Sequence, residues 1–444
     1  MPARILIIGA GRSSTALINY ALANSDELGW NVTVADADPA AAAAKVKGHH
    51  RGNPVWLDVN KTNDRRELIG RADIVVSLLP AHLHLEVAQD CIRLKKHLVT
   101  ASYVSQELYR LGDEARNREL IFMGEMGLDP GIDHMTAMQR INSIREKGAT
   151  ITAFRSFTGG LIAPESNDNP WGYKFTWNPR NVVLAGQGTA QYLENKKLKF
   201  LPYQRLFRTT WSVDIPGQGQ FEAYANRDSL LYREQYGLED IPTILRGTLR
   251  YPGFCAAWAA LVRIGLTNAD FPILDSAKIT YHELMEALAP SGPGSVKDRI
   301  AMMLKLDPVG PVMERLVWLG LFRKKRINLP DATPALILEK LLLKKWKLAA
   351  TDKDLIVMQH QIDYELDGKS YRDISNLTMT GNNAEDTAMA RLVGLPMGIF
   401  TRLISQGKIQ ATGVHIPTMR EVYEPVLEEM KQYGMVFTHE TVAL

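Results

Sequence analysis

Short apolar runs alternate with helical segments over the first 130 residues of the chain. The run at residues 4–8, RILII, is apolar enough for a strand buried on both faces of a parallel sheet, and a helical pattern follows residue 14. Further runs predict strands at residues 31–35, 57–59, 73–80 and 97–103. This rhythm predicts an α/β domain with a parallel sheet and with polar residues gathered at the strand ends.

The pattern changes beyond residue 130. Residues 131–147 predict a helix, and residues 149–157 predict a strand that leads to Gly159-Gly160. A long segment of strands and loops follows, and residues 253–350 are mostly helical. The helical runs in that stretch are 254–265, 296–306 and 334–348.

The last part of the chain predicts a hairpin and two helices. Residues 354–366 and 369–380 read as strands joined at Asp367-Gly368, a common hairpin turn. The helices at 387–405 and 424–433 are expected to return to the first domain. We therefore predict three domains, which are 1–130 with 385–444, 131–252 with 351–384, and 253–350.

The segment GAGRSS follows the first strand directly. Gly9 allows a tight turn, Gly11 lets the backbone approach a pyrophosphate, and the helix N-terminus offers free amides. Ser14 stands where the third glycine of GxGxxG is usual, so the motif is incomplete. The strand, turn and helix together predict a Rossmann-type nucleotide-binding domain.

An acidic residue, Asp36, ends the second predicted strand at the spacing where a carboxylate commonly binds the adenosine ribose. A carboxylate there also repels a 2′-phosphate, which favours NAD over NADP unless Arg12, Lys45 or Lys47 reaches that phosphate. The alternative is a solvated acid at a strand end.

The segment GEMGLDPGIDHM, residues 124–135, concentrates glycine, proline and carboxylates at the end of the first domain. Gly127 and Gly131 suit a turn or a close ligand approach, Pro130 stiffens it, and Asp129 can point a charge beyond the strand ends. The alternative is a connecting loop whose glycines only turn the chain.

Composition is that of an ordinary globular protein. The 444 residues are 45% hydrophobic and 23% charged, with a net charge of +3, which gives no case for nucleic acid or an anionic membrane as partner. The two cysteines, Cys91 and Cys255, lie in apolar helical surroundings and indicate a reducing compartment. We find no signal peptide and no apolar run long enough to span a bilayer, so a cytoplasmic location is expected.

Eight segments in order resemble saccharopine reductase, also called saccharopine dehydrogenase (L-glutamate-forming), over nearly the whole chain. They are GAGRSS, LDVN, VVSLLPAHLH, KKHLVTASYV, GEMGLDPGIDHM, PESNDNPWGYKF, NRDSLLYREQY and RGTLRYPGF. VTASYV and GEMGLDPGIDHM are closer to the dehydrogenase half of the bifunctional plant and animal enzyme than to the fungal one. The first strand starts at residue 4, so we expect a stand-alone enzyme without the lysine-ketoglutarate reductase half.

The resemblance implies a fold and an activity. It implies a Rossmann-type domain, a mixed-sheet α+β domain that binds substrate and forms a homodimer, and a helical lid domain. The implied reaction oxidises the secondary amine of saccharopine with NAD or NADP and water, which yields L-glutamate and 2-aminoadipate 6-semialdehyde. NAD is the expected cofactor, because fungal members that take NADP have an arginine where this chain has Ala37.

The implied cofactor contacts lie in the first turn, at strand ends, in the 128–130 turn and after a Tyr-Lys-Phe-Thr-Trp run. Together with Asp36 they are Gly9, Ala10, Gly11, Arg12, Asp58, Val59, Leu79, Ala101, Ser102, Leu128, Asp129, Pro130 and Asn178.

Saccharopine carries three carboxylates, an ammonium and a secondary amine, so its site needs fixed arginines and at least one carboxylate. The segments NRDS and RGTLRY supply arginines beside turn residues, although a surface salt bridge is the usual role of each alone. The implied substrate contacts are Ser102, Tyr103, Asp129, Arg227, Thr248, Leu249 and Arg250, with Arg246 as a supporting charge.

Three titratable residues are candidates for the base that accepts the amine proton. They are Asp129, Tyr103 and Lys174, and bulk solvent is the alternative. No histidine, cysteine and carboxylate group has metal-ligand spacing, so no metal is expected, and His82 and His84 are expected to be solvated.

Two other function classes fit the nucleotide-binding domain. One is a related C–N dehydrogenase that acts on lysine or carboxynorspermidine, from which we expect weaker agreement at NRDS and RGTLRY. The other is a non-catalytic regulatory protein that binds NAD(P), which would be expected to have lost Asp129 or the arginines.

Overall fold

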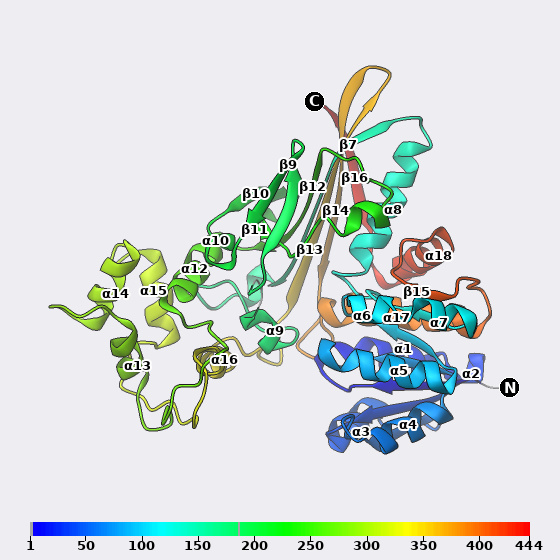
Figure 1. Cartoon of the computed structure of the whole chain (residues 1–444), viewed down its shortest axis with the longest axis horizontal. Coiled ribbons are helices and arrows are strands. Elements are labelled where there is room, and N and C mark those ends of the chain that lie inside the picture. Colours follow the sequence, from blue (N-terminus) through cyan, green and yellow to red (C-terminus); the bar gives the residue numbers. More distant parts are fainter. Residues whose placement is uncertain (1–2, 185–186) are drawn as a thin grey trace. The chain divides into compact units, whose positions relative to one another are not determined.

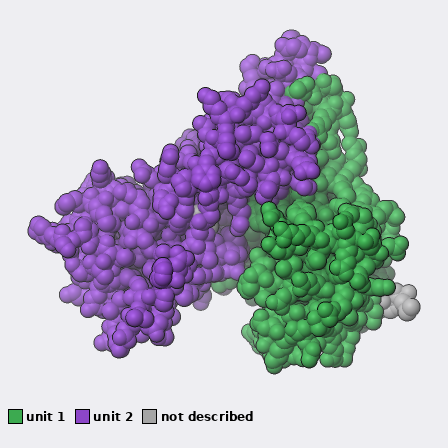
Figure 2. All heavy atoms as spheres, in the orientation of Figure 1, with its two compact units in different colours: residues 1–150, 379–437 green, residues 151–378, 438–444 purple. Residues whose placement is uncertain are grey.

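The computed structural model describes residues 3–184 and 187–444 and divides the chain into two compact units (Figure 2). Unit 1 consists of residues 1–150 and 379–437, and unit 2 of residues 151–378 and 438–444. The chain therefore leaves unit 1, completes nearly all of unit 2, and returns to unit 1.

Unit 1 is built on a seven-stranded parallel sheet with the order β15-β6-β5-β4-β1-β2-β3. Its edge strand β15 is labelled in Figure 1. The central strands are buried on both faces, as their apolar runs predict. The strands are β1 (Arg4–Ile8), β2 (Asn31–Asp36), β3 (Gly52–Trp56), β4 (Ile74–Ser77), β5 (His97–Thr100), β6 (Ile121–Met123) and β15 (Gly413–His415). This sheet, with helices between its strands, confirms the Rossmann-type fold class.

The helices of unit 1 come from both ends of the chain. They are η1 (Arg12–Ser14), α1 (Thr15–Ala23), α2 (Ser25–Leu28), α3 (Pro39–Val46), α4 (Thr62–Arg71), η2 (Ala81–Leu83), α5 (His84–Leu94), α6 (Gln106–Tyr109), α7 (Gly112–Asn117), α8 (Ile132–Arg145), α17 (Ala388–Ser405), α18 (Arg420–Met430) and η4 (Lys431–Tyr433). Helix α17 packs closely on α1, because a Cβ at Gly394 would lie 2.7 Å from the Leu17 nitrogen. Helix α8 also belongs to unit 1, where the Asn142 amide donates to the Tyr423 hydroxyl of α18 at 2.9 Å.

Helix α17 corrects one expectation from the sequence. Among the described residues it is the one helix long and apolar enough to cross a membrane, with a mean hydropathy of 1.2. No such run was expected from the sequence. In the structure 72% of that helix is buried within the fold, as in the core helix of a globular protein.

Unit 2 contains a nine-stranded mixed sheet whose main path is β10-β11-β12-β7-β13-β14-β16, with β8 paired to β12 and β9. β12 runs parallel to β7 and antiparallel to β11. The strands are β7 (Thr150–Ile162), β8 (Ala190–Glu194), β9 (Lys197–Leu201), β10 (Thr210–Ile215), β11 (Gly219–Ala225), β12 (Thr243–Arg250), β13 (Asp354–Leu366), β14 (Lys369–Thr380) and β16 (Phe437–Ala443).

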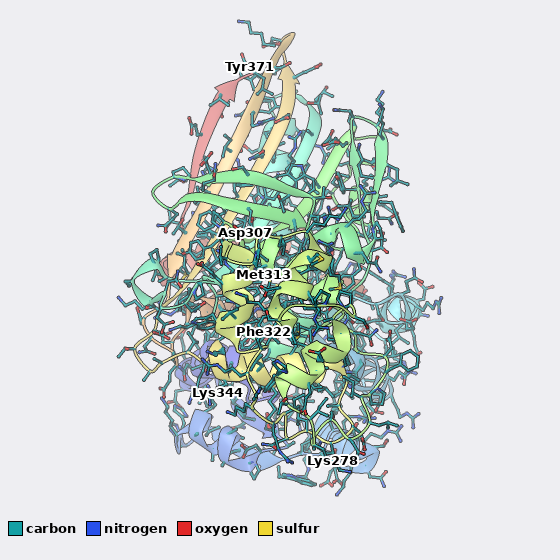
Figure 3. The ribbon with its side chains drawn as sticks, turned by 90° about the vertical axis from the view of Figure 1, so that its left-hand side faces the viewer. Lys278, Asp307, Met313, Phe322, Lys344 and Tyr371 are labelled. Carbon is teal, nitrogen blue, oxygen red and sulfur yellow. The ribbon has the colours of Figure 1, made fainter. Side chains whose placement is uncertain are left out.

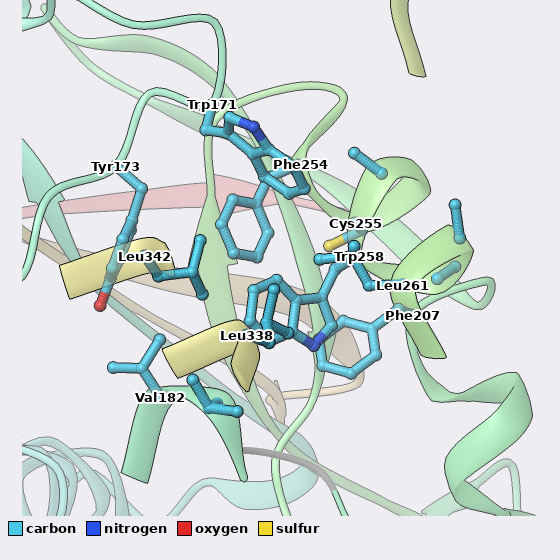
Figure 4. Packing of buried hydrophobic residues seen from close by; sticks show 14 of the residues in the cluster. Trp171, Tyr173, Val182, Phe207, Phe254, Cys255, Trp258, Leu261, Leu338 and Leu342 are labelled. Atoms are coloured by element: carbon cyan, nitrogen blue, oxygen red, sulfur yellow. The ribbon is translucent and has the colours of Figure 1, made fainter. Parts of the chain in front are cut away.

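The helical segment of unit 2 shares one hydrophobic core with this sheet. Phe157 and Leu249 of the strands and Trp258, Leu316 and Leu338 of the helices belong to the same buried cluster, part of which is drawn in Figure 4. Figure 3 looks onto the segment, in which the labelled Met313 is fully buried. The helices are η3 (Pro164–Ser166), α9 (Pro179–Val183), α10 (Tyr203–Leu206), α11 (Tyr232–Gln235), α12 (Phe254–Ile264), α13 (Tyr281–Leu288), α14 (Val296–Leu304), α15 (Pro311–Leu319) and α16 (Pro334–Lys345). The structure therefore groups residues 253–350 with the sheet, where the sequence predicts a separate domain.

Among the predicted elements whose bounds differ from the observed ones, two have a clear local cause. The third strand of the parallel sheet ends at Trp56, before the predicted 57–59 run, because the Asp58 carboxylate accepts the Asn60 N–H at 3.1 Å and starts a turn. The predicted strand 149–157 continues to Ile162, because Gly159 lets β7 pass Leu249, whose Cβ would lie 2.8 Å from an added methyl.

Candidate functional site

The first turn of unit 1 has the geometry of a dinucleotide-binding turn. Gly9 has φ +110 and touches Leu78, so the protein itself requires glycine there. Gly11 is different, because a Cβ built on it would meet nothing within 4 Å. No protein atom therefore requires glycine at this position. Open space above the backbone is expected where a ligand approaches it closely, so the turn fits a nucleotide.

Asp36 is tied to this turn. One carboxylate oxygen accepts the Ala10 N–H at 2.6 Å, and the other accepts the Asp38 N–H at 2.8 Å. The end of β2 and the glycine turn are therefore locked together, as a ribose-binding carboxylate requires. Lys45, half-buried nearby in α3, donates to the Thr15 hydroxyl, and burial lowers its pKa.

The ends of β4 and β5 are joined by a buried histidine. His84 is only 4% exposed, and its Nδ1 lies 3.0 Å from the Ser77 hydroxyl. Its Nε2 lies 2.8 Å from the Ser102 hydroxyl and 3.2 Å from that of Thr100. The prediction of a solvated His84 is wrong, because α5 begins at this residue and turns the ring inward, whereas His82 is exposed as predicted.

The GEMGLDPGIDHM segment packs tightly against the end of β5. A Cβ at Gly131, where φ is +146, would lie 2.1 Å from the Gly127 carbonyl oxygen. The Met126 and Glu125 N–H groups donate to the Thr100 and Ser102 carbonyls, both at 3.0 Å. The glycines therefore build a compact turn, which contains a cis Asp129–Pro130 bond, and they do more than reverse the chain.

Buried polar side chains support this turn. Glu125, Asp133 and His134 are all under 5% exposed. His134 Nε2 lies 2.8 Å from the Glu125 carboxylate, whose other oxygen accepts the Val104 N–H at 3.1 Å. Asp133 accepts the Gly131 N–H at 2.6 Å. His134 thus has a structural role, because it supports the turn through Glu125.

Two predicted site residues meet on this turn. The Tyr103 hydroxyl donates to the Asp129 carboxylate at 3.3 Å, and Ala101 lies against Gly127. A pocket of about 200 Å³ lies beside Tyr103 and is also lined by His84 and Leu108. The remaining predicted cofactor positions of unit 1 also follow the C-terminal ends of strands. Asp58 and Val59 follow β3, Leu79 follows β4, and Leu128 and Pro130 lie in the turn after β6.

Unit 2 places Arg250 in a cage of aromatic rings. Its guanidinium carbon lies 5.1 Å from the Tyr173 ring centre, 5.3 Å from that of Phe254 and 5.8 Å from that of Tyr224. Burial lowers the pKa of Arg250, but Tyr224 and other nearby acidic groups raise it, and the net direction is upward. Arg250 is therefore a buried, fully charged cation. Its Nε has no hydrogen-bond partner among the described protein atoms.

The other predicted substrate residues of unit 2 all come before Arg250 in the chain. Thr248 and Leu249 are its neighbours on β12. Thr248 hydrogen-bonds Tyr224, and the Leu249 carbonyl accepts from Arg250 at 2.8 Å. The Leu249 side chain is fully buried, so only its backbone can face a ligand. Arg227 is exposed, and its own backbone φ is +51. Arg246 is buried, and its guanidinium carbon lies 4.3 Å from the centre of the Tyr232 ring.

Lys174 and Asn178 are held by groups of unit 2. The Lys174 ammonium donates to Asp352 at 2.7 Å and to Asp168 at 2.9 Å. Burial lowers the pKa of Lys174, but these two hydrogen bonds raise it, and the net direction is upward. A general base needs the opposite shift. The Asn178 side chain caps α9 by accepting the Arg180 and Asn181 N–H groups.

Within the part of the chain that the structure describes, one group of side chains has metal-ligand geometry, which the sequence spacing did not predict. Ligand atoms of Asp26, His49 and His50 lie within 4.8 Å of one another near the surface of unit 1. The Arg51 guanidinium donates to the same Asp26 oxygen at 2.7 Å. That positive charge opposes a cation, so the group resembles a surface ion-pair cluster.

Sequence reasoning missed the supporting residues of the site. The sequence did not point to Glu125, nor to Ser77 and Thr100 as partners of His84, nor to the aromatic cage around Arg250. A polar residue inside a predicted apolar helix face, such as His84 in HLEVAQDCI, is the signal that was available.

The chain matches known proteins over its whole length. Residues 5–123 match the family described as "Saccharopine dehydrogenase NADP binding domain", and residues 127–435 match "Saccharopine dehydrogenase C-terminal domain". The saccharopine dehydrogenase [NADP(+), L-glutamate-forming] of Pyricularia oryzae is 33% identical over 99% of both chains. The mitochondrial alpha-aminoadipic semialdehyde synthase of Bos taurus is 35% identical over 98% of this chain, which spans 47% of that relative.

A solved structure agrees with these matches. The apo saccharopine dehydrogenase (L-Glu forming) of Saccharomyces cerevisiae superposes with a TM-score of 0.88 at 32% identity, and 99% of this chain is covered. The homospermidine synthase of Legionella pneumophila, with a TM-score of 0.58 at 11% identity, shares the fold alone. With a glycine turn that fits a dinucleotide, a caged arginine and full-length relatives above 30% identity, this chain belongs to the saccharopine dehydrogenase (L-glutamate-forming) family.

Proposed function

We propose that this protein oxidises saccharopine with NAD(P) and water to L-glutamate and 2-aminoadipate 6-semialdehyde, with NAD(P) as hydride acceptor, as part of lysine metabolism. The observation that carries the proposal is the caged Arg250, a buried cation with hydrogen-bonding capacity that the described protein atoms leave unused. Such a group suits a carboxylate ligand, and saccharopine has three carboxylates.

When bound, the dinucleotide would supply the hydride acceptor for the lysine ε-carbon of the substrate. The residues of this chain bind the dinucleotide and the substrate and orient them toward each other. The Gly9–Gly11 turn and Asp36 hold the dinucleotide, and Arg250 and Arg227 each hold a substrate carboxylate. Asp129, steadied by Tyr103, meets the cationic end of the substrate.

An absorbance assay tests this function. Purified protein is mixed with saccharopine and either NAD or NADP, and the reduced cofactor is followed by its absorbance. Lysine and carboxynorspermidine serve as control substrates, since related C–N dehydrogenases act on them. Turnover of a control substrate in place of saccharopine, or binding of cofactor without any turnover, would contradict the proposal.

Asp129 tests the division between binding and proton transfer. Asp129→Asn keeps the shape and removes the charge, so we expect KM for saccharopine to rise about tenfold while the pH profile of kcat keeps its form. An ordinary aspartate titrates well below the neutral range in which a base for this amine works best.

The control for this variant is Tyr103→Phe, which removes only the hydroxyl that donates to Asp129 at 3.3 Å. It should raise KM less than Asp129→Asn does. A kcat that collapses at unchanged KM, with the basic limb of the pH profile gone, would instead make Asp129 the general base.

Cofactor preference is a separate proposal. The family description and the names of the fungal relatives print NADP, whereas Asp36 and Ala37 at the end of β2 favour NAD. We propose that NAD gives the higher kcat/KM. Asp36→Ala should lower the ratio of kcat/KM with NAD to kcat/KM with NADP by roughly tenfold, because it removes a charge that repels the 2′-phosphate. A higher kcat/KM with NADP than with NAD for the unmodified enzyme would refute this preference. It would mean that this chain uses the cofactor named for its fungal relatives.

We also propose a homodimer and a cytoplasmic location, both from the family resemblance. Light scattering of the purified protein, and the location of a tagged copy in the cell, test these two points.

A further inference from the structure

His84 connects the two strand ends that carry predicted ligand contacts. Its ring bonds Ser77 at the end of β4, and it bonds Thr100 and Ser102 at and after the end of β5. The ring also hydrogen-bonds the carbonyl of Leu79. Two of these partners, Ser102 and Leu79, are predicted to touch the cofactor or the substrate.

The ring stays neutral at working pH. Burial lowers the pKa of His84 to about 4, and the charge of His82 contributes in the same direction. A neutral imidazole offers one N–H donor and one acceptor nitrogen. The bond between Nε2 and the Ser102 hydroxyl is kept in either tautomer, since the hydroxyl can donate or accept.

The backbone of Ser102 is already fixed without His84. The Ser102 N–H donates to the Thr100 hydroxyl at 3.2 Å, and the Ser102 carbonyl accepts the Glu125 N–H at 3.0 Å. The remaining freedom is rotation of the side chain among its staggered rotamers. The bond to His84 selects one of these rotamers.

We propose that His84 is a positioning residue, which sets the direction of the Ser102 hydroxyl and of the Leu79 carbonyl for cofactor and substrate. The proposal rests on the proposed function in one respect, the roles predicted for Ser102 and Leu79. The alternative is that His84 only fills the core between α5 and the sheet.

A matched pair of variants separates these two roles. The amide of glutamine reaches the place of Nε2, next to Ser102, whereas the amide of asparagine reaches only the place of Nδ1, next to Ser77. We expect His84→Gln to keep kcat/KM for saccharopine within about threefold of the unmodified enzyme and His84→Asn to lose about tenfold, at similar thermal unfolding midpoints. Equal losses in the two variants would overturn the proposal.

A double-mutant cycle tests whether His84 acts through Ser102. We expect His84→Asn and Ser102→Ala each to lose about tenfold, and the double variant to lose little more than either, because both changes remove the same oriented hydroxyl. A loss of about a hundredfold in the double variant would mean independent roles and would also overturn the proposal. His282→Ala, at a histidine of unit 2 outside the proposed site, is the control and should leave activity unchanged.

Failure of the proposed function would be seen separately. If the unmodified enzyme does not oxidise saccharopine, that function is wrong, and the same variants are compared by fluorescence titration with reduced cofactor. The affinity for cofactor should then follow the same order, with His84→Gln tighter than His84→Asn. Equal affinities would refute the positioning role by itself.

Discussion

Replacing Arg250 with alanine is expected to lower kcat/KM for saccharopine about thirtyfold or more, which corresponds to roughly 2 kcal/mol of lost charge-assisted binding. Arg250 is buried among the rings of Tyr173, Tyr224 and Phe254, so hydrogen bonds from its guanidinium to a substrate carboxylate would be little screened by water. Arg250→Lys should lose about tenfold, because lysine keeps the charge but not the planar fork. Steady-state kinetics with saccharopine measures both effects, and cofactor affinity should change little.

A buried arginine elsewhere in unit 2 provides the control. Arg299 donates to the Pro290 carbonyl at 3.0 Å and forms an ion pair with Glu286, so its charge is already balanced by a protein carboxylate, although its Nε, like that of Arg250, has no partner among the described atoms. Arg299→Ala should lower the unfolding midpoint without raising KM. Arg227→Ala should lose about as much kcat/KM as Arg250→Ala, since it is proposed to hold a second carboxylate. If both Arg227→Ala and Arg250→Ala turn over saccharopine normally, the substrate site lies elsewhere.

Gly131→Ala is expected to destabilise unit 1 by roughly 3 kcal/mol or more. The added methyl would lie 2.1 to 2.4 Å from backbone atoms of Gly127, and φ at this residue is +146. Neither backbone can move freely, because the turn is bonded to the carbonyls of Thr100 and Ser102. The thermal unfolding midpoint, followed by circular dichroism, measures the effect.

Gly148→Ala isolates the backbone part of this cost. Gly148 also has a positive φ, of +80, and belongs to unit 1, but a Cβ there meets nothing within 4 Å. It should cost only about 1 kcal/mol, the usual penalty for a left-handed residue with a side chain. Similar midpoints for Gly131→Ala and Gly148→Ala would show that the turn relaxes around the methyl.

The pattern of apolar residues predicts the elements of this fold well where local signals are strong. The hairpin at Asp367-Gly368 is found with both strands at the predicted bounds, 354–366 and 369–380. The pattern fails where a tertiary contact decides. Gly159 suggests a turn, but it permits close packing of β7 on β12, and no local sequence shows that neighbour. The single core of unit 2 likewise depends on contacts between residues far apart in the chain.

The candidate site shows the same division. Turn residues such as Gly9, Gly131 and Asp129 are visible in the sequence because their chemistry requires particular residue types at fixed spacing. The role of His84 cannot be predicted from the sequence in the same way. A histidine at a helix start can be solvated or buried, and only the packing of α5 on the sheet decides which. The cage around Arg250 brings together rings from a loop, from β11 and from α12, which sequence spacing cannot relate.

The close contact between α1 and α17 has a consequence for synthesis of the chain. Gly394 and Gly398 of α17 let it lie directly on Leu17 and Tyr20 of α1, yet roughly 360 residues separate the two helices. At about 5–20 residues per second, a ribosome needs roughly 20 to 70 s to make that stretch. The surface of α1 around Leu17 and Tyr20 therefore stays exposed to solvent until the segment from β7 to β14 has been synthesised and α17 follows it. A nascent chain of this protein should need chaperone protection at its N-terminal segment until the returning segment emerges.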